Sequence, residues 1–183
     1  MTPFRHLVRL LSGLVAALAF VAAGPALAGD HGHRHELKPG RVLIDGDVAR
    51  RLVVDAADLA KLPQQALTLS FLSGSGYQTH TYTGPLLIDV LALAKPDFDA
   101  AVKGDKLRHY VVVTGSDGYR AVVAWGEFDP EFAAKQVVLA ITEDGASLAD
   151  VGPRLLVPGD LRGGRYVSEV VSIRLGPADR GRD

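Results

Sequence analysis

Short apolar segments separated by glycine-containing turns constrain the fold of this chain most strongly. Residues 110–114 are apolar, residues 115–118 read Gly-Ser-Asp-Gly, and residues 119–125 form a second apolar segment. This order predicts a β-hairpin, because glycine and aspartate favour tight turns and β-branched residues favour strands. Apolar residues take helical spacing at residues 54–62 and 86–94. Short strands that outnumber helices, without a regular strand–helix alternation, predict an α+β fold.

Local signals refine these elements. Asp55 precedes the first helical segment as a candidate N-cap, and Pro63 ends it. The second helical segment predicts a buried face made of Leu87, Val90, Leu91 and Ala94. Residues 127–134 are expected to form a short turn or helix. Further strands are predicted at residues 41–48, 66–72, 78–82, 137–142, 155–157 and 167–175.

The first 28 residues are typical of a secretory signal peptide. Arg5 and Arg9 give a positive start, an apolar run follows over residues 7–23, and Ala26-Leu27-Ala28 is a small-x-small cleavage signal. An uncleaved membrane anchor is the alternative, but it needs a longer apolar span than this one. The arginines are not adjacent and form no twin-arginine pair, which favours export of an unfolded chain. We therefore expect a periplasmic protein.

The chain then divides into a signal peptide at residues 1–28, a flexible histidine-rich leader at 29–40, one domain at 41–175 and a tail at 176–183. Removing the signal peptide leaves 155 residues and changes the formal net charge from −1 to −3. A chain of this charge without a basic stripe excludes a typical nucleic-acid-binding protein.

The absence of cysteine limits both stability and chemistry. The sequence contains no cysteine, so the chain has no disulfide, no thiolate metal ligand and no thiol nucleophile. The hydrophobic core must hold the fold together unaided, and a domain of this length is large enough to do so.

The loop in residues 152–166 has the composition of a ligand cradle. It combines Arg162 and Arg165 with Gly163, Gly164 and the aromatic Tyr166. Glycine allows close approach of the backbone to a ligand, and arginine offers a planar fork of donors to anions and carbonyls. The loop is therefore expected to hold a flat, polar molecule.

Four segments in order carry a family resemblance. They are the helix at residues 83–91, the hairpin at 114–119, the strand at 138–140 and the loop at 152–165. Together they resemble the molybdopterin-binding domain of the sulfite-oxidase superfamily in its short, single-domain bacterial form, over about residues 41–175. The resemblance implies a mixed α+β fold of short helices and strands with a cleft that binds a pterin.

The same resemblance implies where a metal would be bound. In the enzymes of the superfamily, a cysteine thiolate after an early strand ligates molybdenum, and the matching segment here is residues 68–73. Phe71 or Leu72 stands near the thiolate position, and neither can replace a soft thiolate. A hydroxyl of Ser70, Ser73 or Ser75 is the alternative ligand. We therefore expect a reduced pterin, or molybdopterin, as the ligand and no molybdenum.

The functional expectation follows from that ligand. Similar cysteine-less periplasmic proteins of the superfamily bind reduced pterins and control a membrane diguanylate cyclase/phosphodiesterase. The resemblance implies a non-catalytic regulator of this kind, with the periplasmic domain of a membrane signalling protein as its partner. The alternatives are a molybdopterin-dependent oxidoreductase subunit with unusual molybdenum ligation, and a metal-binding periplasmic protein.

Candidate ligand-binding residues are those that offer stacking faces or hydrogen bonds to a pterin. Trp125 alternatively belongs to the core, Asp117 to a turn, Glu127 to a helix cap and His80 to the surface. The full set is Tyr77, Thr79, His80, Ser116, Asp117, Tyr119, Trp125, Glu127, Arg162, Gly163, Gly164, Arg165 and Tyr166.

The histidines of the leader suggest a separate metal site. Cleavage after Ala28 would leave Gly29-Asp30-His31 at the amino terminus, with His33 and His35 close by. A free amine, amides and an imidazole suit square-planar Cu(II) or Ni(II). The alternative is a polar leader without a metal-binding role.

Overall fold

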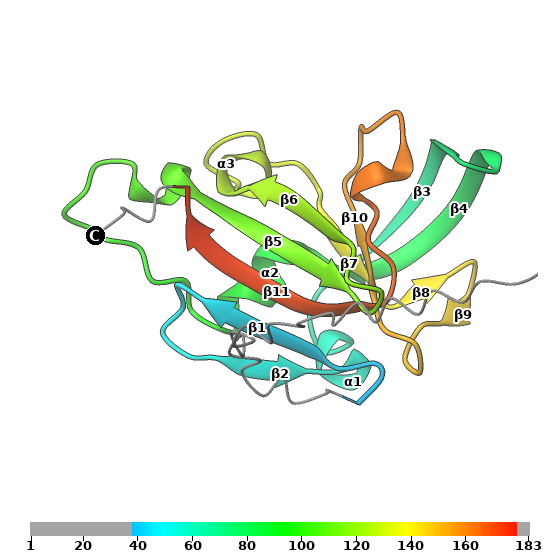
Figure 1. The fold of residues 1–183 in the computed structure, drawn as a ribbon, viewed down its shortest axis with the longest axis horizontal. Helices are drawn as coiled ribbons and strands as arrows, with labels where there is room; N and C mark the ends of the chain where they lie inside the picture. Colours follow the sequence, from blue (N-terminus) through cyan, green and yellow to red (C-terminus); the bar gives the residue numbers. More distant parts are fainter. Residues whose placement is uncertain (1–37, 179–183) are drawn as a thin grey trace, which may run out of the picture. The chain divides into compact units, whose positions relative to one another are not determined.

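We describe residues 38–178 from a computed structural model (Figure 1). The predicted signal peptide, the leader up to residue 37 and the tail from residue 179 lie outside this range. Within it, no helix is both long and apolar enough to cross a membrane.

A five-stranded sheet forms the largest layer. Its strand order is β2-β1-β11-β5-β6, and β1 and β11 pair in parallel while the other pairs are antiparallel. Every second residue of β5 is buried, as expected for a sheet with one face on the core. The strands are β1 Val42–Gly46, β2 Leu52–Val54, β5 His109–Gly115, β6 Arg120–Ala124 and β11 Val170–Pro177.

The predicted hairpin at residues 110–125 is present as β5 and β6. The turn closes with a hydrogen bond from the Gly118 N–H to the Gly115 carbonyl, and Gly118 has a φ of 83°. The second strand stops at Ala124, one residue earlier than predicted, because Trp125 begins helix α3.

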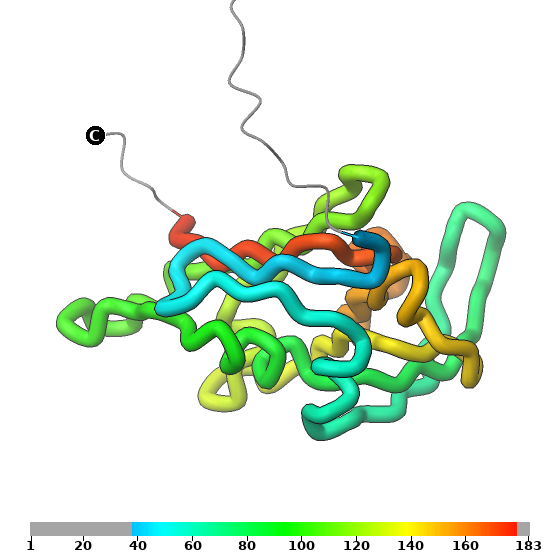
Figure 2. Tube along the Cα trace, turned by 90° about the horizontal axis from the view of Figure 1, so that it is seen from below, coloured from blue at the N-terminus to red at the C-terminus, as the bar shows by residue number. Residues whose placement is uncertain are grey.

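A second, four-stranded sheet has the order β3-β4-β8-β9, and a two-stranded ribbon pairs β10 with β7. In Figures 1 and 2 the hairpin of β3 and β4 extends away from the five-stranded sheet. The strands are β3 Gln64–Ser73, β4 Gly76–Pro85, β7 Val138–Ala140, β8 Thr142–Glu143, β9 Ala146–Ser147 and β10 Arg154–Leu156.

The β3–β4 hairpin is longer than the sequence predicted. Its register runs without a break from Gln64↔Pro85 to Ser73↔Gly76. The predicted loop at residues 73–76 is therefore a tight turn, and residues 83–85 end β4 instead of opening the next helix. Polar residues such as Thr79 and Thr81 alternate with half-buried ones along β4, which is the pattern of a strand with one solvated face.

The helices are short. α1 Ala56–Leu59 begins where predicted, with the Asp55 side chain accepting from the N–H groups of Ala57 and Asp58. α2 Leu87–Ala92 buries the predicted apolar face completely. The others are α3 Trp125–Phe128 and the 3₁₀ helices η1 Asp105–Arg108 and η2 Gly163–Arg165.

The core includes the inner face of the large sheet, α2 and the β7–β10 ribbon. Val111, Val113, Leu139 and Leu155 are fully buried. Every residue of β7 is apolar and buried, and so are Leu155 and Leu156 of β10, so the ribbon lies inside the chain and not on a solvated sheet. Apolar burial therefore holds the fold together without any disulfide.

Close backbone packing at Gly84 joins β4 to β7. A Cβ added there would collide with the Leu139 carbonyl oxygen and the Ala140 Cα, which are backbone atoms that cannot rotate away. We expect Gly84→Ala to lower the free energy of unfolding by about 1–3 kcal/mol, measured by urea denaturation. Gly74→Ala is the matched control because nothing lies within 4 Å of its added Cβ. Equal stability of the two variants would contradict this packing.

Candidate functional site

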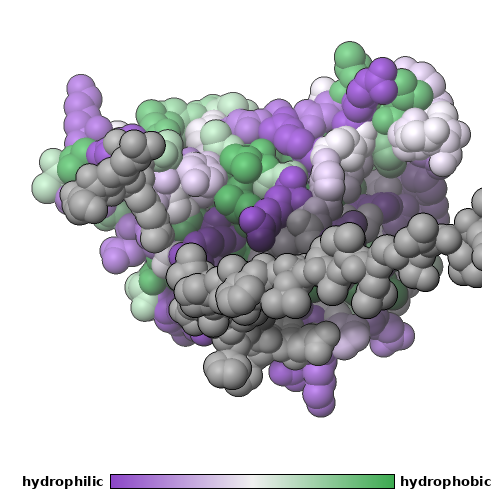
Figure 3. Space-filling model, viewed as in Figure 1, coloured by the Kyte–Doolittle hydropathy of each residue, from purple (hydrophilic) through white to green (hydrophobic). Residues whose placement is uncertain are grey.

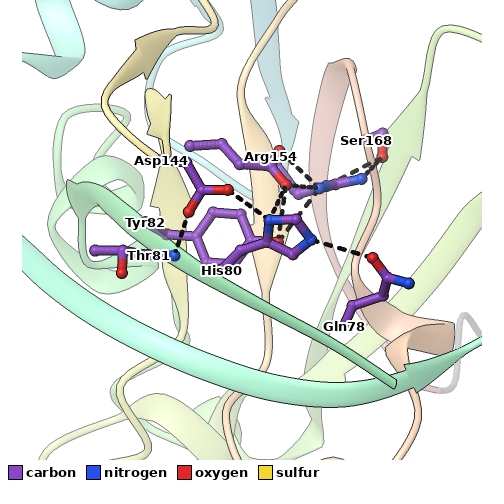
Figure 4. Close-up of polar contacts among 8 residues, drawn as sticks. Gln78, His80, Thr81, Tyr82, Asp144, Arg154 and Ser168 are labelled. Atoms are coloured by element: carbon purple, nitrogen blue, oxygen red, sulfur yellow. Dashed lines mark hydrogen bonds and ion pairs between the residues drawn. The ribbon is translucent and has the colours of Figure 1, made fainter. Parts of the chain in front are cut away.

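One face of β4 carries a group of polar side chains. Gln78, His80 and Tyr82 alternate with Thr79 and Thr81, so they share the face that is turned toward the rest of the chain. The His80 Nδ1 lies 2.6 Å from the Asp144 Oδ2, and its Nε2 lies 3.4 Å from the Gln78 Oε1 (Figure 4). The His80 hydrogen bond, and a second one from the Thr81 N–H, hold the pKa of Asp144 below its usual range.

Arg154 joins this group to two further elements. Its Nη1 donates to both Glu143 carboxylate oxygens at 2.7 Å, and its Nη2 donates to the Ser168 hydroxyl at 2.7 Å. The Tyr82 hydroxyl donates to the Glu143 Oε1 at 3.1 Å. Figure 4 shows Tyr82 from β4, Arg154 from β10 and Ser168 from the segment before β11 converging. We call Gln78, His80, Tyr82, Glu143, Asp144, Arg154 and Ser168 the polar cluster.

Burial controls the acidity of Tyr82. Desolvation raises the pKa of its hydroxyl to about 12, Arg154 lowers it, and the Glu143 carboxylate adds to the increase. Tyr82 therefore stays a neutral hydroxyl that donates to Glu143 over the whole physiological range.

The raised pKa of Tyr82 predicts a stability loss in alkali. A group whose folded pKa lies above its unfolded value of about 10 contributes stability fully below that value, and the contribution is lost as the pH rises toward about 12. Tyrosinate absorbance should show a late-titrating group that is missing in Tyr82→Phe. The variant should also lose part of the alkaline decline in stability. Titration of Tyr82 at or below its ordinary value would contradict the burial argument.

The loop that follows β10 is fixed by Arg165. Its Nε and Nη2 donate to the Asp160 carboxylate at 2.7 Å, and its Nη1 donates to Glu127 at 3.0 Å. Glu127 also accepts from Lys135 at 3.1 Å and from the Ala124 N–H at the start of α3. Asp160 and Glu127 raise the pKa of Arg165 further above its usual value. Because all three guanidinium nitrogens of Arg165 bind carboxylates, this residue positions the loop.

The carboxylates around Arg165 predict an acid-sensitive contribution to stability. The Arg165 hydrogen bonds lower the pKa of Asp160, so the stabilisation is present above the unfolded pKa of about 4 and is lost as the pH falls below it. We expect Asp160→Asn to lower the free energy of unfolding at neutral pH by about 1 kcal/mol. The difference from wild type should shrink below about pH 4. Asp150→Asn, an exposed position, is the control and should leave stability unchanged.

Phe71 is one of the two residues, with Leu72, that the family resemblance sets near the position of a molybdenum-binding thiolate. Its ring lies against that of Tyr166, with centroids 4.7 Å apart in an edge arrangement, and 6.3 Å from the His80 ring. A Cβ on Gly163 would come within 2.7 Å of the same ring. Phe71 thus links the polar cluster to the loop after β10 through apolar contact.

The residues at this position do not fit a molybdenum ion. The chain has no sulfur donor other than its one methionine, and a phenyl ring has no lone pair for a metal. The Ser70 hydroxyl pairs with Thr79 at 2.8 Å, and the Ser73 hydroxyl donates to the Gly76 carbonyl at 3.0 Å. Both hydroxyls are therefore engaged within the hairpin.

The hairpin turn between β5 and β6 touches the loop after β10. The Tyr119 hydroxyl donates to the Gly164 carbonyl at 2.5 Å. Asp117 accepts from the Tyr119 N–H at 2.8 Å and so shapes the turn, while the Ser116 hydroxyl donates to Glu169 at 2.5 Å. The structure therefore brings most of the predicted residues into two linked groups around Phe71.

Other predicted residues lie elsewhere. Trp125 is buried in the core, its ring against Phe98 and Phe128 and its Nε1 donating to Asp129 at 2.6 Å. Thr79 lies on the solvated face of β4, opposite to His80. Tyr77, 78% exposed, and Arg162 lie on the surface beside this site. The leader histidines His31, His33 and His35 fall outside the described residues.

Of the polar cluster, sequence reasoning identified only His80 and missed the others, which are Gln78, Tyr82, Glu143, Asp144, Arg154 and Ser168. Glu143 belongs to a Glu-Asp-Gly sequence that signals only a turn, and Arg154 precedes an apolar strand without a marked partner. The alternation of Gln78, His80 and Tyr82 could have placed Tyr82 with His80. Within residues 38–178, no cluster of three or more histidine or acidic side chains has the geometry to hold a metal ion.

Two surface depressions lie away from the polar cluster. One, of about 240 Å³, lies over the outer face of the large sheet at Tyr110, Val112 and Arg174. The other, of about 490 Å³, lies between β2 and α1 at Arg51, Val53 and Lys61. Neither contains a residue of the predicted ligand set.

The strand order and the short helices define an α+β protein, and the likeness to a solved structure supports the sulfite-oxidase-type fold that the sequence predicted. Among solved structures, the chain is similar to the sulfane dehydrogenase SoxCD from Paracoccus pantotrophus, with a TM-score of 0.59 and 20% identity over 74% of this chain. The chain spans 38% of the length of that protein. This likeness shows the fold alone. No family model and no curated protein matches the sequence.

Proposed function

We propose that this chain binds a reduced pterin without molybdenum, at the surface between the polar cluster and the loop after β10. The observation that supports the proposal is the packing of Phe71, which with Leu72 is expected near the thiolate position, against Tyr166 and beside the polar groups of His80 and Asp144. The site thus keeps donors and acceptors for a heterocycle and has no ligand for a soft metal.

The polar cluster offers the hydrogen bonds that a pterin requires. The aminopyrimidinone edge of a pterin needs an acceptor for its N–H groups and a donor for its carbonyl. Glu143 and Asp144 supply carboxylates on one side of His80, and Gln78 supplies an amide on the other. The Phe71 ring lies next to the imidazole and the Tyr166 ring packs against Phe71, so two buried aromatic rings back this surface.

The regulatory role rests on what surrounds this surface. Leu161 is 84% exposed and Tyr77 is 78% exposed, and Figure 3 shows apolar and hydrophilic residues side by side over the loop after β10. A pterin bound beside this loop would change the surface that a partner meets. The partner in this proposal is the periplasmic domain of a membrane diguanylate cyclase/phosphodiesterase. A ligand shifts such docking only by its differential affinity for the two states.

Two neighbouring residues on opposite faces of β4 test the binding surface. Gln78→Ala should weaken the affinity for a tetrahydropterin about tenfold, because one hydrogen bond of about 1.4 kcal/mol is lost. Isothermal titration calorimetry measures the change. Thr79→Ala is the matched control, since its side chain lies on the other face, paired with Ser70, and its affinity should equal that of wild type.

Two results would reject the proposal. Equal pterin affinity of Gln78→Ala and wild type would show that the polar cluster is not part of the binding site. Stoichiometric molybdenum in protein purified from the periplasm would show that the ligand is a molybdenum cofactor and not a metal-free pterin. The expected result is a fluorescent pterin released on denaturation, and tighter binding of the partner's periplasmic domain when the pterin is present.

A further inference from the structure

Strand β3 has an open backbone edge. It is the outermost strand of the four-stranded sheet, and β4 pairs with its other side. The Leu72 N–H donates to the Leu161 carbonyl at 3.0 Å and therefore points away from β4. Backbone groups of alternate residues point the same way along a strand, so those of Ser70, Thr68 and Ala66 also point outward.

The outer edge of β4 confirms this orientation of the backbone groups. The carbonyls of Thr81 and Thr83 accept from the N–H groups of Asp144 and Ile141, so they point away from β3. Their cross-strand partners Thr68 and Ala66 must then also point away from β4. Across residues 38–178, no other backbone group pairs with the outward groups of Ala66, Thr68 or Ser70.

This edge lacks the usual protection against strand pairing. The sequence of β3 is Gln-Gln-Ala-Leu-Thr-Leu-Ser-Phe-Leu-Ser, without charge or proline, and its register with β4 has no bulge. Natural edge strands usually carry a lysine, a proline or a bulge that prevents another strand from joining. The side chains of Ala66, Thr68 and Ser70 are exposed, and within the described part of the chain no backbone group pairs with the edge at these residues.

We propose that β3 pairs with β3 of a second copy of this chain, in antiparallel register about a two-fold axis at Thr68. Thr68 then exchanges reciprocal N–H···O=C hydrogen bonds with Thr68 of the second copy, and Ala66 does so with Ser70. Leu161 and Arg162 already occupy the edge at Leu72 and limit the paired segment to residues 66–70. The two four-stranded sheets become one continuous sheet, independently of any ligand.

The side chains fit a second copy of β3 in particular. The same register sets half-buried Leu67 opposite Leu69 of the second copy, and Leu69 opposite Leu67, on the face where both pack against the core. On the solvated face, Thr68 and Ser70 already pair with Thr81 and Thr79. The two-fold axis extends this hydroxyl ladder and brings no like charges together.

Two charge variants that differ only in their strand test the proposal. Thr68→Lys places two lysines directly opposite each other at the axis, whereas Thr81→Lys places the same charge on the same face one strand away. Both remove the same hydroxyl pair of 3.0 Å, so their unfolding free energies should match. By sedimentation equilibrium, the protein expressed from the full sequence should dimerise. Thr68→Lys should raise the dissociation constant about fivefold or more, and Thr81→Lys should leave it unchanged.

A mixing experiment identifies the axis. Thr68→Lys and Thr68→Glu should each associate weakly alone, and an equimolar mixture should regain the wild-type mass because opposite charges then face each other. Thr68→Val removes the hydroxyl but no backbone group and should dimerise like wild type. A monomeric wild type at all concentrations, equal loss in Thr81→Lys, or a mixture that stays monomeric would overturn the proposal.

Discussion

The Arg154 guanidinium holds together the parts of the chain on which the candidate site depends. From β10 it reaches Glu143 on β8 and Ser168 just before β11, and Glu143 in turn accepts from Tyr82 on β4. These four residues come from the two-stranded ribbon, the four-stranded sheet and the approach to the five-stranded sheet. A charged fork with fixed geometry does this where the chain has no disulfide to do it. The face of β4 that carries His80 takes its position from that fork.

The parts of the fold that the sequence predicted are those with local causes. The β5–β6 turn follows from its Gly-Ser-Asp-Gly sequence, the start of α1 follows from the Asp55 cap, and the buried face of α2 follows from helical spacing. The length of the β3–β4 hairpin was missed because Gly84 and Pro85 resemble a helix start. They lie in β4 because close contact with β7 requires a glycine at position 84. No neighbouring residue in the sequence indicates that contact.

The residues of the candidate site also divide into those with a local sequence signal and those without one. Gly163, Gly164, Arg165 and Tyr166 were found because they are adjacent in sequence. Arg154, Glu143 and Tyr82 meet only through tertiary structure, and Tyr82 and Arg154 are 72 positions apart in the sequence. Phe71 was one of two residues, with Leu72, expected near the thiolate position, and its contacts with Tyr166 and Gly163 depend on how the loop after β10 folds back. The sequence therefore indicated the chemistry of single residues, but it did not indicate which residues come together in the fold.

The only tryptophan of the chain acquires a use from its surroundings. Trp125 begins α3, the same short helix that carries Glu127, and Glu127 holds Arg165 in the loop after β10. Its indole is buried against Phe98 and Phe128 and bound to the Asp129 carboxylate. A rearrangement of that loop would disturb α3 and with it the environment of one fluorophore. The molecule thus contains an intrinsic fluorescence probe. Trp125 lies two residues before Glu127, which holds the loop after β10 through Arg165.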